Sequence, residues 1–259
     1  MVNKNGSGSA QLLLLKEINE SVNRGEPLDE ILQRAVEGVA EIFRYDACDI
    51  FLLEEDDTLR YAALAIDPVI KRAVEKLTGL TIIGFKIPIF EGSCFSEVLE
   101  SKGPVVFDDM AKVFEDFTDS RGLKKFAPAV ARIVRFKRAL RVPLISNGNA
   151  LGVLGAATRR DISPEDVQVL ELFASHLAVV VERIRLEEQL KAYTKELERK
   201  VEERARELKE AYEKVSAALE EVEEKNAELE RFNKFMIGRE LRMVELKKKI
   251  KELEARLKK

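Results

Sequence analysis

The amino-acid sequence predicts an α+β protein in which an antiparallel sheet flanked by helices precedes a long α-helical coiled coil. Two observations carry this prediction. All seven prolines and twelve of the thirteen glycines lie before residue 186, where helical and strand-like segments alternate. From residue 186 onward, apolar residues recur in steps of three and four among many charges. We therefore expect a disordered tail at residues 1–9, a mixed domain at 10–185 and a coiled-coil helix at 186–259.

The mixed domain divides into segments at turn residues and at changes of apolar period. Gly25 and Pro27, for example, interrupt the first helical pattern. In chain order we expect two helices within residues 11–43, a hairpin over 47–66, a helix near 68–77, a strand over 84–90, a helix within 91–103, a strand over 104–109, a helical stretch over 110–135, a hairpin over 138–160 and a helix from 164 onward.

Three local signals support these assignments. The acidic residues 55–57 separate two apolar runs, as a hairpin turn does. Residues 147–149, Asn-Gly-Asn, predict the turn of the second hairpin. The last helix has Ser163 at its N-cap, Pro164 at its first helical position and two acids in its first turn, which is typical of a helix start.

The segment 186–259 carries a heptad-like apolar pattern, and a helix with such an uncovered stripe needs a partner helix. A parallel homodimer is the simplest arrangement. Asn226, at a core position of this pattern, either fixes the register or lies on a frayed surface. The dimer seam is predicted at Leu190, Leu197, Leu208, Val215, Val222, Leu229, Met236, Met243, Ile250 and Leu257.

Composition excludes several classes of protein. The formal net charge of −3 argues against a nucleic-acid partner, and the basic end of the helix is read as a solvated C-terminus. Two cysteines and one histidine are too few for a disulfide framework or a metal cage. No apolar stretch approaches the about 20 residues of a membrane span, and the N-terminal residues lack a signal-peptide pattern. We expect a reduced, soluble, cytoplasmic protein.

Three stretches together resemble the GAF domain family: residues 14–56 (LLKEINESV…FLLEED), 88–109 (PIFEGSCFSEVLESKGPVVFDD) and 142–186 (VPLISNGNALGVLG…VERIRL). The resemblance covers about residues 10–190 and lies in the order of the segments. It implies a GAF-like sensor domain followed by a signalling helix. Residues 232–259 resemble the linker helix of microbial sensor proteins, which implies a junction that transmits a signal.

The middle of the domain is rich in phenylalanine, and this region would line the pocket of a GAF domain. Arg132 is a candidate to meet an acidic ligand. The alternative is that the rings simply fill the core, and that Cys94 is a small buried residue and not a reactive thiol. The candidate pocket residues are Phe85, Phe90, Cys94, Phe95, Phe107, Phe114, Phe117, Phe126 and Arg132.

No catalytic residue and no cofactor is predicted. His176 shares a helical face with Phe173 and Val180, and Leu177 follows it where a kinase phosphoacceptor would have an acid. We read it as a packed side chain. Phe95 follows Cys94 where bilin-binding GAF domains usually have histidine, and the cyclic-nucleotide signature of the family is not visible.

The sequence therefore predicts a non-enzymatic sensor that binds a small-molecule ligand and signals through a dimeric coiled coil. The downstream partner implied by the resemblance is a histidine kinase or regulator of a two-component system. The alternative is a structural adaptor, in which a ligandless domain caps a dimerising helix and recruits a separate kinase or regulator.

Overall fold

Antiparallel pairing joins six strands into one sheet in the computed structural model, which describes residues 4–257 and the side chains of residues 8–251. The strands lie in the order β3-β2-β1-β6-β5-β4, so the last hairpin of the domain sits at the centre beside the first. Their bounds are β1 Ala47–Leu53, β2 Thr58–Ile66, β3 Lys86–Pro88, β4 Val105–Phe107, β5 Arg138–Ser146 and β6 Asn149–Thr158.

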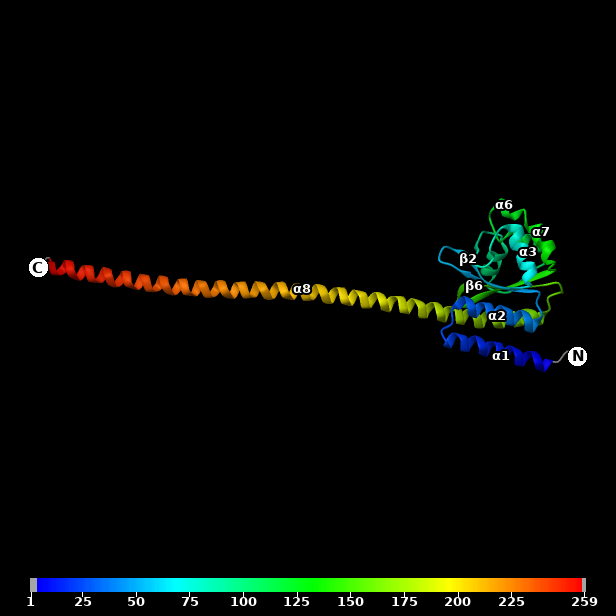
Figure 1. Ribbon diagram of the computed structural model, residues 1–259, viewed down its shortest axis with the longest axis horizontal. Helices are drawn as coiled ribbons and strands as arrows, with labels where there is room; N and C mark the ends of the chain where they lie inside the picture. The colour runs from blue at the N-terminus through cyan, green and yellow to red at the C-terminus, as the bar shows by residue number, and fades with distance from the viewer. Residues whose placement is uncertain (1–3, 258–259) are drawn as a thin grey trace. The chain divides into compact units, whose positions relative to one another are not determined.

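Helices cover both faces of this sheet (Figure 1). One face packs against α1 (Lys4–Asn23), α2 (Leu28–Phe43) and the first part of α8 (Pro164–Leu257). Shorter helices cover the other face: α3 Pro68–Thr78, α4 Cys94–Ser101, α5 Met110–Glu115, α6 Arg121–Lys124 and α7 Ala127–Val134. The predicted α+β class, with an antiparallel sheet between helices and a long C-terminal helix, is confirmed.

Strand alternation produces two separate cores. In β1, Cys48 and Ile50 pack against the long helices, while Phe51 belongs to the apolar cluster on the opposite face. This is the period of two expected of an extended strand. The second face therefore has its own core, which leaves room for a site beneath the short helices.

A β-bulge in β2 changes this alternation. Ile50 pairs with Ala63 and Phe51 pairs with Tyr61, so Ala62 is an extra residue in the strand. An inserted residue reverses which side chains face which side. As a result Tyr61 and Leu64, three residues apart, both belong to the core beneath the short helices.

The start of α8 is fixed by a hydrogen-bonded cluster around Asp166. The main-chain nitrogen of Asp166 donates to Ser163 Oγ at 3.2 Å, which confirms Ser163 as the N-cap. Arg160 donates to both carboxylate oxygens of Asp166, at 2.7 and 2.6 Å, and Tyr45 Oη donates to Oδ1 at 3.0 Å. Arg160 and Tyr45 therefore tie the helix start to the end of the sheet.

The structure adds detail to one local expectation and corrects another. Residues 110–135, expected to be helical, contain three short helices, with a turn at residues 116–120 between α5 and α6. Residues 4–9, expected in a disordered tail, belong to α1; residues 1–3 lie outside the described residues. The predicted second hairpin is confirmed, with positive φ at Asn147 (50°) and Gly148 (82°).

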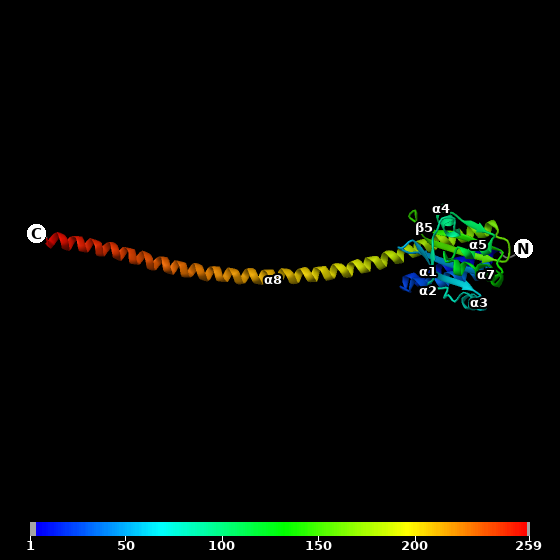
Figure 2. The ribbon, with the colours of Figure 1, turned by 90° about the horizontal axis from the view of Figure 1, so that it is seen from above.

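The chain divides into two compact units, Met1–Gln189 and Leu190–Lys259. The predicted division at residue 185 lies four residues earlier. Helix α8 is continuous from Pro164 to Leu257 in both views (Figures 1 and 2). Among the described residues, no helix has the length and apolar character that crossing a membrane requires.

Candidate ligand-binding site

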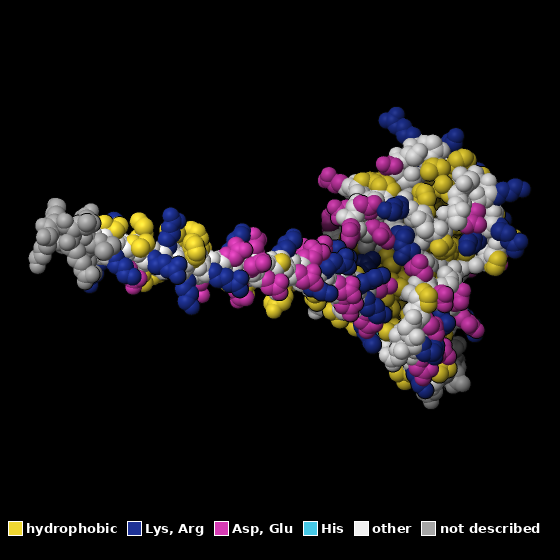
Figure 3. Space-filling view, turned by 60° about the vertical axis from the view of Figure 1, so that its left-hand side comes forward, with side chains coloured by type: hydrophobic (Ala, Val, Ile, Leu, Met, Phe, Trp, Pro, Cys, Tyr) yellow, Lys and Arg dark blue, Asp and Glu magenta, His cyan; other side chains and the backbone are white. Residues whose placement is uncertain are grey.

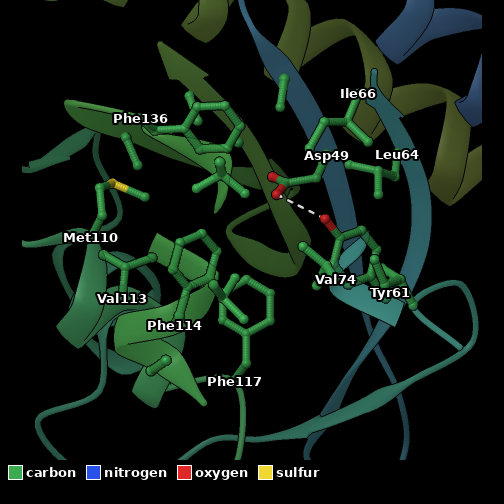
Figure 4. A pocket seen from close by; sticks show the side chains of 18 of the residues that line it. Asp49, Tyr61, Leu64, Ile66, Val74, Met110, Val113, Phe114, Phe117 and Phe136 are labelled. Atoms are coloured by element: carbon green, nitrogen blue, oxygen red, sulfur yellow. Dashed lines mark hydrogen bonds between the residues drawn. The ribbon is translucent and has the colours of Figure 1, made fainter. Parts of the chain in front are cut away.

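A cavity of about 140 Å³ lies between the sheet and the short helices. Strands β1, β2, β5 and β6 form its floor, and helices α3, α5 and α7 form its walls. Its lining is mostly apolar, with rings from Phe114, Phe117 and Phe136 directed toward its centre (Figure 4). An apolar cavity with a few polar groups is the usual form of a small-molecule site.

Three polar side chains meet on the floor. Asp49 comes from β1, Tyr61 from β2 and Arg141 from β5. Tyr61 Oη donates to Asp49 Oδ2 at 3.1 Å, and Arg141 Nη1 lies 3.8 Å from Asp49 Oδ1 (Figure 4 shows the first contact). The second distance is an ion pair and too long for a hydrogen bond.

Arg141 is unusually buried for a charged residue, with 3% of its surface exposed. Its guanidinium carbon lies 4.9 Å from the ring centre of Phe51, 4.5 Å from that of Phe95 and 5.4 Å from that of Phe117. Nε and Nη1 have no hydrogen-bond partner among the described residues. The rings therefore stabilise the charge, but two of its donor atoms are unsatisfied.

Burial sets the charge state of the floor. It raises the pKa of Asp49, and the nearby Arg141 and the Tyr61 hydroxyl oppose that rise in part. Burial and the charge of Asp49 also raise the pKa of Tyr61 well above its usual value. Tyr61 therefore remains a neutral phenol, which donates a hydrogen bond to the carboxylate.

Gly155 on β6 provides the space for this group of side chains. A Cβ atom at this position would lie 2.0 Å from Asp49 Oδ1 and 3.4 Å from Arg141 Nη1. No side chain larger than glycine fits there without moving the carboxylate. Ala139 and Ala157, which also line the floor of the cavity, are likewise small residues.

The predicted pocket residues divide into two groups. Phe85, Phe114, Phe117 and Phe126 line the cavity, so the structure brings these four together. The remaining five do not line it. Phe95 is fully buried, Arg132 is exposed on α7, and the ring centre of Phe90 lies 4.8 Å from Lys124 Nζ. Cys94 and Phe107 line a second hollow.

The second hollow, of about 330 Å³, lies beside the start of α4. The main-chain nitrogen of Cys94 donates to Asp116 Oδ2 at 2.8 Å. Burial raises the pKa of the Cys94 thiol to about 12. The thiol is therefore protonated at neutral pH, which favours the reading of Cys94 as a small buried residue.

Sequence reasoning missed the three polar residues of the floor. Asp49 and Arg141 each interrupt an apolar strand, in CDIF and ALRVPL, and this is the signal that could have found them. A charge within a buried strand needs a partner or a function. Among the described residues, no group of His, Cys, Asp and Glu side chains could hold a metal ion.

Two sets of hydrogen bonds connect the sheet to α8. Arg185 Nη2 donates to the main-chain oxygen of Leu53 at 2.9 Å. Glu182 accepts from Ser146 Oγ at 2.6 Å and from Asn147 Nδ2 at 2.9 and 3.0 Å. Strands β1 and β5, which carry Asp49 and Arg141, thus end on residues held by the helix.

The predicted seam residues from Leu190 to Ile250 lie on α8 and are exposed in the single chain; the side chain of Leu257 lies outside the described residues. Their exposed fractions run from 37% at Met236 to 72% at Leu208. Apolar and charged side chains share the visible surface of this helix (Figure 3). His176 is half-buried, burial lowers its pKa, and its Nε2 has no hydrogen-bond partner among the described residues.

Comparison with known proteins gives one family match. The GAF domain family model matches residues 27–181. No curated protein matches the chain.

Solved structures with the same fold include two GAF domains and a segment of a chemotaxis protein. A GAF domain of phosphoenolpyruvate-protein phosphotransferase from Acinetobacter is 17% identical, with a TM-score of 0.51 over 71% of this chain and 97% of that one. A phycoerythrobilin-bound GAF domain of a cyanobacterial phytochrome is 14% identical, with a TM-score of 0.52 over 70% and 99%. Residues 122 to 287 of a methyl-accepting chemotaxis protein are 20% identical, with a TM-score of 0.50 over 67% and 97%. At these identities the likeness concerns the fold alone.

Proposed function

Since the chain belongs to the GAF domain family, a family of signalling and sensor domains, we propose that it is a non-enzymatic sensor. A small molecule binds in the cavity over Asp49 and Arg141, and its presence changes the conformation of α8. The helix pairs with that of a second copy as a parallel coiled coil and passes the change to a partner, such as a histidine kinase or regulator.

The observation that carries this proposal is the direct connection between the cavity floor and α8. Asp49 and Leu53 lie on the same strand, and the main-chain oxygen of Leu53 accepts a hydrogen bond from Arg185. Arg141 and Ser146 lie on β5, and the hydroxyl of Ser146 donates a hydrogen bond to Glu182. A ligand that moves either strand therefore moves a residue that α8 holds.

The apolar seam of α8 supports the dimer. Exposed large apolar residues recur along residues 190–250 at coiled-coil spacing, among charged residues. A soluble helix with such a stripe gains free energy by covering it with a second helix. A parallel pair is favoured, because it places both copies of the cavity at the same end of the coiled coil.

Transmission requires two conformations of the pair between which the ligand discriminates. Rotation or sliding of the two helices by a fraction of a turn is one of the known forms of such a change. The apolar steps between Leu197 and Leu208 run four, four, three, which departs from the strict repeat. Such a departure weakens the preference for one packing.

The adaptor alternative requires a domain whose rings fill the interior. Phe117 does contact Phe114 and Tyr61, with ring centres 5.8 and 6.2 Å apart, respectively. A cavity of about 140 Å³ nevertheless remains beside them. This volume, with unsatisfied donors on its floor, favours the sensor over the adaptor.

Native mass spectrometry of the purified chain tests the first two steps. The proposal expects a dimer that carries a discrete small-molecule adduct. Single cysteines along residues 190–250, in a chain with Cys48 and Cys94 replaced by alanine, then report the helix packing by disulfide crosslinking. The crosslinked positions should differ between the protein with its adduct and the same protein after unfolding, washing and refolding. A monomer, or identical crosslinks in both states, contradicts the proposal.

A further inference from the structure

The chemical class of the ligand follows from the unsatisfied donors of Arg141. Resting on the sensor function proposed above, we propose that the cavity binds a small carboxylate with an apolar body, whose carboxylate accepts hydrogen bonds from the Arg141 guanidinium. A guanidinium donates charge-assisted hydrogen bonds to a carboxylate. In Arg141, Nε and Nη1 have no partner among the described residues, and the residue lines the cavity.

The charges around the cavity favour an anion. Its charged lining residues are Asp49, Lys71 and Arg141, which leaves an excess of positive charge. In the adjoining stretch of chain, the basic residues Arg121, Lys124 and Lys125 near Leu123 and Phe126 are balanced by the acidic residues Glu115, Asp116 and Asp119 near Phe117 and Thr118, so the excess comes from the lining itself. Asp49 is already occupied by the Tyr61 hydroxyl and by its ion pair with Arg141. A cationic ligand would meet more repulsion than attraction.

Phe117 is the one ring of the three around Arg141 that lines the cavity with it. Of the three rings around Arg141, those of Phe51 and Phe95 are fully buried, whereas Phe117 lines the cavity and is half-buried. It lies in the turn after α5 and not within a regular element. Rotation of this one ring would make room beside the guanidinium, and the carboxylate would take that position.

The volume of the cavity limits the apolar body. An apolar cavity of roughly 150 Å³ in a protein accommodates a benzene molecule, and this cavity is of about 140 Å³. The walls are aromatic and aliphatic, with rings from Phe114 and Phe136 beside the open space. A single ring or a branched chain of similar size, with one carboxylate, fits these limits.

Isothermal titration calorimetry with three probes of nearly equal shape tests the class. Benzoate carries the proposed carboxylate, benzamide is its neutral counterpart and benzylamine is a cation. The full chain should bind benzoate with a saturable heat in the millimolar range or below, and bind benzamide and benzylamine at least tenfold more weakly. This tenfold is about 1.4 kcal/mol, the lower end for hydrogen bonds to a charged group.

Substitution of the arginine provides the second test. Arg141→Met should weaken benzoate binding about 10- to 100-fold and leave benzamide nearly unchanged. Arg132→Met is the matched control, since Arg132 is exposed on α7 and does not line the cavity. If Arg141→Met does not fold, the double variant Asp49→Asn/Arg141→Met, which leaves no unpaired buried charge, gives the same comparison.

The outcomes separate this inference from the sensor function. Absence of benzoate binding, or preference for benzylamine, overturns the carboxylate class, while the crosslinking test of the sensor stands by itself. Benzoate binding that Arg141→Met does not weaken also overturns it. Benzoate binding that depends on Arg141 but leaves the α8 crosslinks unchanged upholds the ligand class and contradicts the transmission step.

Discussion

Arg185 Nη2 donates a hydrogen bond of 2.9 Å to the main-chain oxygen of Leu53, which joins α8 to the last residue of β1. Asp49, on the cavity floor, lies four residues earlier in the same strand. The strand is buried and paired on both sides, with β2 and β6. We expect such a strand to move as a unit, so that under the proposed function a displacement at Asp49 would reach Leu53.

We therefore expect Arg185→Ala to separate ligand binding from the response of the helix. The loss of one partly buried hydrogen bond should lower the free energy of unfolding by about 1 kcal/mol. Benzoate affinity should change less than twofold, but the benzoate-dependent shift in α8 crosslinking should shrink. Arg183→Ala, whose exposed side chain pairs with Glu187, is the control and should keep the shift. A full shift in the Arg185 variant would mean that the signal takes another route.

Gly155→Ala should destabilise the domain and weaken ligand binding. The added Cβ would lie 2.0 Å from Asp49 Oδ1, so the carboxylate and the strand must move. Overpacking of this kind costs about 2 kcal/mol, measured by urea unfolding, and benzoate binding should fall with it. Gly103→Ala is the control, because its nearest neighbour would be 3.8 Å away. Wild-type stability and affinity in the Gly155 variant would show that Asp49 has an alternative position.

The sequence predicted the sheet and its helices because each strand carries a clear local signal. The Asn147–Gly148 turn has the positive φ values that a two-residue hairpin turn requires, and the apolar runs beside it alternate. Ser163 and Asp166 likewise mark the start of α8 through residues that are neighbours in sequence. Local chemistry of this kind can be read without knowledge of the fold.

The cavity could not be read in the same way. The bulge at Ala62 leaves no mark in the sequence, yet it places both Tyr61 and Leu64 on the cavity side. Asp49 and Arg141 come together across β6, from strands almost a hundred residues apart. The phenylalanine-rich middle segment predicted part of the walls, but Phe95 and Phe117 differ in burial for reasons of tertiary packing alone.

Val215→Asp should weaken the proposed dimer, because it would place two carboxylates opposite each other in the predicted seam. Loss of the apolar contact and the added repulsion should cost about 3 kcal/mol, or roughly 100-fold in the dimer Kd. Sedimentation equilibrium at low micromolar concentration measures the change. Ala217→Asp introduces the same charge off the seam and should remain dimeric. Equal dimer stability in the two variants would contradict the predicted seam.

Asp166→Asn should destabilise the domain by about 2 kcal/mol, since Arg160 and Ser163 lose charge-assisted hydrogen bonds. Burial raises the pKa of Asp166, but hydrogen bonds from Arg160 and Ser163 outweigh it and hold the pKa well below its usual value. This contribution is therefore present above the unfolded pKa of about 3.9 and is lost as the pH falls further. Urea unfolding at pH 7 and pH 3 should show a smaller difference between variant and wild type at pH 3. A constant difference would argue against the charge of Asp166 as its source.

His176 should make the domain less stable at mildly acidic pH. Burial lowers its pKa, so the unfolded chain takes up the proton at a higher pH than the folded domain does. The contribution of His176 to the free energy of unfolding should then decrease as the pH falls through about 6.5, until the lowered pKa is passed. Asp49 acts in the opposite sense, since its pKa is raised by burial, and it partly masks the effect in the wild type.

His176→Gln isolates this contribution, because the sequence contains a single histidine. Glutamine keeps a polar side chain of similar reach but does not titrate. Between pH 7 and pH 5, the wild type should lose more stability than the variant, as measured by the urea midpoint at each pH. Arg132→Gln, at an exposed position of α7, should follow the wild type. If the His176 variant loses stability as steeply as the wild type, the histidine is solvated well enough to titrate alike in both states, and its place on α8 has no bearing on the response to pH.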